Sequence, residues 1–86
     1  MVMDNKASYM KDGVLLAYVT YPFIDDGVVL IDHTFVDSSL RGQGIASLLM
    51  NEAYLDIKAH NYKAKLLCSY AVKWFDEHPE CSDILL

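Results

Sequence analysis

The chain has 86 residues, of which 53% are hydrophobic, so it holds enough apolar material for one core and too much for a disordered segment. The formal net charge of −5 argues against a nucleic-acid partner, which would require a basic stripe. We find no signal-peptide pattern and no apolar run long enough to span a bilayer. We therefore expect a single cytoplasmic domain over residues 1–86, with no membrane partner.

The N-terminal third predicts a β-hairpin. Residues 6–10 and 14–21 are strand-like, and the Asp12-Gly13 pair between them is a turn signal. Pro22 and the Asp-Asp-Gly run at 25–27 then break the second strand.

The rest of the chain alternates between strand and helix patterns. We expect a strand at 28–36, a helix at 46–60, a strand at 64–69 and a helix at 70–78 capped by Ser69. Strand, crossover helix and strand form a βαβ unit, so its two strands should be parallel. The predicted class is α/β, with a mixed sheet of about four strands: hairpin or meander, then βαβ, then a C-terminal helix.

Helix-stop signals support these boundaries. Asn61 tolerates the left-handed conformation that ends many helices, and Pro79 cannot continue one. The last residues, 84–86, are apolar and either dock on the core or fray.

The most informative stretch is the loop that joins the strand at 28–36 to the helix at 46–60. Free N–H groups at a helix start, backed by the positive end of the helix dipole, attract anions. Gly42 and Gly44 would let a phosphate approach the backbone, and Arg41 adds a fixed charge. We expect a diphosphate cradle made by the N–H groups from Gly42 to Ala46; the alternative is a tight turn that binds nothing.

Two other phosphate loops do not fit. A P-loop needs Gly-Lys followed by Ser or Thr, which is absent. The dinucleotide fingerprint needs Gly or Ala at its sixth position, where Ser47 stands, and an acidic residue ending the next strand, where Cys68 and Ser69 stand.

Arg41-x-x-Gly44-x-Ala46 resembles the Q/R-x-x-G-x-G/A loop of the GCN5-related N-acetyltransferases, which holds the pyrophosphate of acetyl-CoA. Residues 31–36, 67–70 and 78–80 extend the resemblance to a small single-domain, acetyltransferase-like subfamily. The resemblance implies a minimal acetyltransferase-like fold with two parallel strands that splay apart. It also implies acetyl-CoA or CoA as ligand, without a metal.

By this resemblance, backbone groups of Phe35 and Val36 would bind the pantetheine arm, and one N–H would stabilise the thioester oxyanion. Their side chains are otherwise expected to pack in the core. The full set of expected cofactor-binding residues is Phe35, Val36, Arg41, Gly42, Gln43, Gly44, Ile45 and Ala46.

Cys68 is a candidate catalytic residue with two interpretations. It follows a strand and precedes a helix, whose positive end favours the thiolate. It would then accept an acetyl group or protonate a departing CoA thiolate. Alternatively it is a small buried apolar residue. Cys81 and Cys68 form no C-x-x-C pair, so we expect neither a zinc site nor a disulfide framework.

Tyr70 and His33 are further candidates. Family members commonly use a helix tyrosine as general acid for the thiolate, although Tyr70 lies nearer its helix start than usual; the alternative is a half-buried aromatic. His33 would act as general base for an amine, or else hold the site in shape through hydrogen bonds. Phe35 stands where related proteins often have a glutamate base.

These observations leave several functions open. The first is an N-acetyltransferase that moves an acetyl group from acetyl-CoA to an unidentified amine or peptide by direct attack. The alternatives are a non-catalytic acetyl-CoA- or CoA-binding module and a regulatory protein. The chain is expected to be a monomer or a homodimer, and a homodimer would complete an acceptor pocket that 86 residues cannot build alone.

Overall fold

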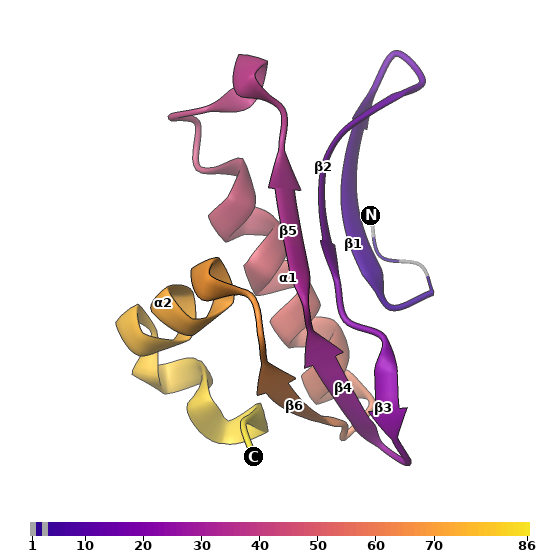
Figure 1. Ribbon diagram of the computed structural model, residues 1–86, viewed down its shortest axis with the longest axis vertical. Coiled ribbons are helices and arrows are strands. Elements are labelled where there is room, and N and C mark those ends of the chain that lie inside the picture. Colours follow the sequence, from indigo (N-terminus) through magenta and orange to yellow (C-terminus); the bar gives the residue numbers. More distant parts are fainter. Residues whose placement is uncertain (1, 3) are drawn as a thin grey trace.

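Helix α1 (Ile45–Ala59) packs across β1, β2 and β5 in a computed structural model, which describes residue 2 and residues 4–86 (Figure 1). The face of α1 that meets the sheets repeats with helical spacing. Leu49, Met50, Ala53 and Ile57 are almost fully buried on it. The predicted helix is thus confirmed, and Asn61 has the expected left-handed φ, 58°, just beyond its end.

The first sheet is antiparallel, with strand order β1-β2-β5. Its strands are β1 (Lys6–Lys11), β2 (Val14–Thr20) and β5 (His33–Val36). The predicted hairpin joins β1 to β2, and both turn residues, Asp12 and Gly13, have positive φ.

The second sheet has strand order β3-β4-β6 and is mixed. β3 (Phe23–Asp25) is antiparallel to β4 (Val28–Ile31), and β4 is parallel to β6 (Lys63–Leu66). The predicted βαβ crossover is therefore confirmed, with α1 as its helix.

The α/β class is confirmed, but the expected sheet of about four strands is two three-stranded sheets. The predicted strand at 28–36 divides at Asp32, because the Asp32 carboxylate accepts a hydrogen bond from the Thr20 hydroxyl at 2.6 Å. The Asp32 N–H also donates to the Thr20 carbonyl at 3.3 Å. These bonds draw the chain from β6 toward β2. The segment after Pro22, where a break was expected, instead contains β3. This strand is defined by its pairing with β4, which forms only in the folded chain.

The C-terminal helix, α2 (Ser69–Glu77), begins one residue earlier than predicted, with Cys68 rather than Ser69 as its N-cap. β6 likewise ends at Leu66, not at 69. The physical reason is that the N–H groups of Leu67 and Cys68 both donate to the Ile31 carbonyl, at 3.0 and 3.1 Å, which ends the regular ladder. Pro79 ends the helix as predicted.

The segment after α2 is a 3₁₀ helix (Pro79–Ile84) that docks on the core. The Ile84 side chain is 2% exposed. The Leu86 N–H donates to the Ala64 carbonyl at 3.1 Å, so the apolar tail docks rather than frays. No helix in the described part of the chain has the length and apolar character needed to cross a bilayer.

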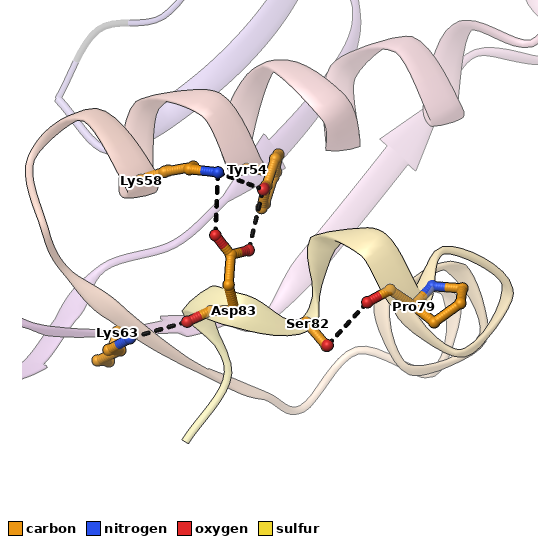
Figure 2. Close-up of polar contacts among 6 residues, drawn as sticks. All are labelled: Tyr54, Lys58, Lys63, Pro79, Ser82 and Asp83. Atoms are coloured by element: carbon orange, nitrogen blue, oxygen red, sulfur yellow. Dashed lines mark hydrogen bonds and ion pairs between the residues drawn. The ribbon is translucent and has the colours of Figure 1, made fainter.

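Polar contacts fasten this segment to α1 (Figure 2). The Asp83 carboxylate accepts a hydrogen bond from the Tyr54 hydroxyl at 2.9 Å and pairs with the Lys58 ammonium at 3.0 Å. The Lys63 ammonium donates to the Asp83 carbonyl at 2.8 Å. Hydrogen bonds from Lys58 and Tyr54 hold the pKa of Asp83 below its usual range.

We expect Asp83→Asn to lower the melting temperature modestly at pH 7. The folded-state pKa of Asp83 lies below its unfolded value, so the ionised carboxylate stabilises the protein above about pH 4. That contribution is lost as the pH falls through the folded pKa, so wild type and variant should converge there. Asp76→Asn is the charge-matched control, because the Asp76 side chain is exposed on α2. Equal losses in both variants at pH 7 would contradict a specific role for Asp83.

Candidate functional site

The loop between β5 and α1 contains a short 3₁₀ turn (Ser38–Leu40) followed by two glycines with left-handed backbone (Figure 1). Gly42 has φ 81°, and Gly44, the N-cap of α1, has φ 72°. A side chain at either position would be strained. A Cβ added at either would meet no atom within 4 Å, so the space beside both backbones is open.

The first turn of α1 follows Gly44 directly and adds its own N–H groups to the loop. The first helical bond runs from the Leu48 N–H to the Gly44 carbonyl at 3.1 Å, so the N–H groups at 45–47 have no helical acceptor. The N–H groups of Arg41 and Gln43 instead donate within the loop, each at 3.3 Å, to the carbonyls of Ser38 and Leu40. The N–H groups at 45–47 are therefore available to an anion, whereas those of Arg41 and Gln43 already donate within the loop.

Asp37 shapes the start of the loop. Its carboxylate accepts hydrogen bonds from the Ser39 hydroxyl at 2.6 Å and the Ser39 N–H at 3.0 Å. These bonds lower the pKa of Asp37. The negative charge is thus turned toward Ser39 and fixes the 3₁₀ turn.

A cavity of about 200 Å³ lies against the loop. It brings together β5, the loop, the start of α1 and the start of α2. Its lining residues are Val36, Leu40, Arg41, Gly42, Gly44, Ile45, Ala46, Ser47 and Tyr70. Of the expected cofactor-binding residues, Phe35 and Gln43 do not line it, and of the expected catalytic residues only Tyr70 does.

The two parallel strands separate beside this cavity. β4 and β6 pair up to Ile31 and Leu66. Beyond that point β5 belongs to the other sheet and the chain after β6 turns into α2 (Figure 1). This is the splay that the resemblance implied, and its cause is the change of partner at Asp32.

Cys68 lies where the strands separate. Its thiol contacts the Thr34 hydroxyl of β5 at 3.4 Å. Partial burial disfavours the thiolate, but hydrogen bonds from Thr34 and from the N–H groups of Ala71 and Tyr70 outweigh it, and the pKa of Cys68 is lowered. Burial instead raises the pKa of Cys81.

We expect Cys68 to be alkylated by iodoacetamide several-fold faster than Cys81 at pH 7. The reason is that the thiolate is the nucleophile, and the two pKa values are shifted in opposite directions. Thr34→Val should move the Cys68 rate profile to higher pH and leave Cys81 unchanged. Mass spectrometry of each cysteine peptide over a pH series measures both. Equal rates at the two cysteines would contradict this description.

Tyr70 is half-buried at the edge of the cavity, near the start of α2. Burial and the charge of Glu77 raise the pKa of the Tyr70 hydroxyl, while a hydrogen bond with Ser47 acts in the opposite direction. The phenol therefore keeps its proton at neutral pH and has one to donate. Ser47 also lines the cavity, although its residue type served above only to exclude the dinucleotide fingerprint. Its place at the third position of α1, in the turn expected to bind phosphate, was the available signal.

His33 and Phe35 lie on the face of β5 opposite Thr34 and Val36. Both are exposed, and their rings lie 5.6 and 5.4 Å from the ring of Tyr18. The structure therefore does not bring His33 to the cavity that Tyr70 lines.

A larger hollow of about 550 Å³ lies between α2, β6 and the C-terminal tail. Its lining is mostly apolar, with Lys73 and Asp76 as its only charged members. It includes neither the glycines nor the first turn of α1, so the smaller cavity is the better candidate for an anionic ligand.

Comparison with known proteins connects this geometry to a family. Residues 6–84 match the family described as GCN5-related N-acetyl-transferase. Protein NATD1 of Gallus gallus and of Homo sapiens are each 33% identical over 63 residues, which are 73% of this chain and 57% and 56% of theirs. The chain thus spans little more than half the length of these relatives.

Solved structures agree on the fold. The solution structure of a GCN5-like protein from Staphylococcus aureus has a TM-score of 0.80 and 29% identity, covering 100% of this chain and 85% of that one. Ard1 from Thermoplasma volcanium has a TM-score of 0.65 and 17% identity, covering 83% and 51%, and shares the fold.

Proposed function

Because the chain belongs to the GCN5-related N-acetyltransferase family, we propose that it binds acetyl-CoA at the glycine loop and transfers the acetyl group to an amine. The observation that carries this proposal is the cavity that joins the loop and the start of α1 to Val36 and Tyr70. A ligand in it would lie between the phosphate-binding donors and the point where the strands separate.

The residues present fit the diphosphate of CoA. Gly42 and Gly44 leave open space at the backbone, and the N–H groups at 45–47 lack helical acceptors. Arg41 lines the same cavity. Although the net charge is −5, binding a diphosphate requires only this local concentration of donors and positive charge.

The proposed reaction is direct acyl transfer. The amine nitrogen attacks the thioester carbon, a C–N bond forms, and the C–S bond breaks. The nitrogen loses one proton to solvent, and the departing thiolate gains one. Tyr70 is the proposed donor of that second proton, because it lines the cavity and its raised pKa keeps it protonated.

Cys68 offers a second route within the same proposal. Its lowered pKa and its position at the strand separation suit a nucleophile that takes the acetyl group and passes it on. In that case the Cys68 sulfur–carbon bond forms as the CoA sulfur–carbon bond breaks. Mass spectrometry of the protein after mixing with acetyl-CoA would detect the added acetyl group.

A specific observation also favours a non-catalytic acetyl-CoA- or CoA-binding module. The carboxylate of Asp32 accepts a hydrogen bond from Thr20, and His33 points to the opposite face of β5 from the cavity side. With an aromatic ring rather than a carboxylate at Phe35, no general base lines the cavity among the residues that the structure describes.

Binding and turnover are tested separately. Acetyl-CoA at about a hundred times its dissociation constant should stabilise the protein by roughly 2.7 kcal/mol, which a thermal-shift measurement detects. Release of free CoA thiol, with and without candidate amines, then separates transfer from binding. The absence of a thermal shift would overturn both functions, whereas a shift without amine-dependent thiol release would favour the binding module.

The same proposal includes a cytoplasmic location and a chain that is a monomer or a homodimer. Cys68 and Cys81 are free thiols, which is typical of a reducing compartment such as the cytoplasm. Homodimerisation would supply surface for an acceptor amine or peptide. Size-exclusion chromatography with light scattering distinguishes monomer from dimer.

A further inference from the structure

Ser47 connects the two helices that border the cavity. It lies in the first turn of α1, and its hydroxyl oxygen accepts a hydrogen bond from the Trp74 indole N–H of α2 at 2.8 Å. Trp74 is only 3% exposed. Its ring stacks on His78 at 4.0 Å and meets Phe75 edge-on at 4.9 Å. The indole therefore holds the serine oxygen in a fixed place.

This bond determines which further hydrogen bond the Ser47 hydroxyl can make. Because the oxygen already accepts from Trp74, its own proton is available for a second partner. Tyr70 is on α2 one turn before Trp74, and it lines the same cavity as Ser47. Because residues four apart lie on one face of a helix, Tyr70 lies on the side of α2 that Trp74 turns toward Ser47. A hydrogen bond donated by the serine would act to lower the pKa of Tyr70, against the larger effect of burial.

We propose that Ser47 is a positioning residue, which orients the Tyr70 hydroxyl into the cavity beneath the glycine loop while Trp74 holds Ser47 in place. This inference rests on the proposed function and deepens it. Sequence spacing alone does not indicate it, since Ser47 is 23 positions before Tyr70.

The arrangement couples the two ends of the site. The N–H of Ser47 is among those at 45–47 without a helical acceptor, and its side chain lines the same cavity as the proposed proton donor, Tyr70. One residue would therefore serve both the anion-binding turn and the proton donor. A ligand that orders the start of α1 would thereby also order the Tyr70 hydroxyl.

The first test uses the protein without ligand. Carbon-13 NMR of labelled tyrosine rings follows the titration of Tyr70, which Tyr70→Phe identifies among the six tyrosines. Ser47→Ala removes the donor, so the pKa of Tyr70 should rise; Ser47→Thr should restore it. Ser82→Ala is the matched control, because Ser82 donates to the Pro79 carbonyl away from the cavity. An unchanged Tyr70 titration in folded Ser47→Ala would overturn the inference.

The second test measures acetyl transfer. Ser47→Ala should lower kcat about tenfold, the effect of losing roughly one hydrogen bond, with KM for acetyl-CoA changed less than about twofold. The loss should not add to that of Tyr70→Phe. A change confined to KM, or full additivity, would contradict a positioning role. Failure of the wild type to bind acetyl-CoA would overturn the proposed function, and the ligand-free titration would still decide the role of Ser47.

Discussion

Gly44→Val should abolish acetyl-CoA binding while leaving a folded protein. Gly44 precedes α1 with φ 72°, and the space beside its Cα is open. Valine there would fill the space that a phosphate needs and would strain the left-handed backbone by about 1–3 kcal/mol. The affinity for acetyl-CoA, measured by titration calorimetry, should fall at least about a hundredfold, because the donors at 45–47 would be both displaced and covered.

Gly27→Val separates the two effects. Gly27 has φ 69°, and a Cβ there also meets nothing within 4 Å, but it lies in the turn between β3 and β4. Its valine variant should lose similar stability and bind acetyl-CoA normally. If Gly44→Val binds as tightly as Gly27→Val, the loop is not the phosphate site.

Of the substitutions considered, Leu49→Ala should lower the free energy of unfolding the most. The Leu49 side chain is 2% exposed on the face of α1 that packs in the core. Truncating it removes buried apolar surface and leaves a cavity, at a cost of about 2–5 kcal/mol. For a domain of this size that is a large part of the total free energy of unfolding. Urea denaturation followed by circular dichroism measures the loss.

The neighbouring leucine provides the control. Leu48 is 54% exposed on the same helix, so Leu48→Ala makes the same chemical change with little loss of burial. We expect it to change stability by less than about 0.5 kcal/mol. Comparable losses in both variants would mean that α1 does not pack as described.

Sequence reasoning predicted the parts of the fold that local signals determine. The Asp12-Gly13 turn set the hairpin, and the spacing of Leu49, Met50, Ala53 and Ile57 set α1. The glycine loop was predicted for the same reason, because it lies between a strand and a helix start that are adjacent in sequence. These features depend on residues no more than a few positions apart.

Most features that depend on distant residues were not predicted. The parallel pairing of β4 and β6 is an exception, because a strand–helix–strand pattern implies it. The division of the strand at 28–36 follows from the Thr20–Asp32 hydrogen bond, and β3 follows from pairing with β4. Tyr70 and Ser47 line one cavity only because α2 folds back beside α1. In each case the determining contact forms after the chain has folded, so no local spacing encodes it.

The docked residues 84–86 also affect whether copies of this chain can associate through a sheet edge. β6 is the outer strand of its sheet, and such strands offer unpaired backbone groups to neighbouring chains. Leu85 forms a bridge with Ala64, and the Leu86 N–H occupies the Ala64 carbonyl. A second molecule could pair with this edge of β6 only after displacing Leu85 and Leu86. These two residues therefore oppose edge-to-edge association between copies of the chain.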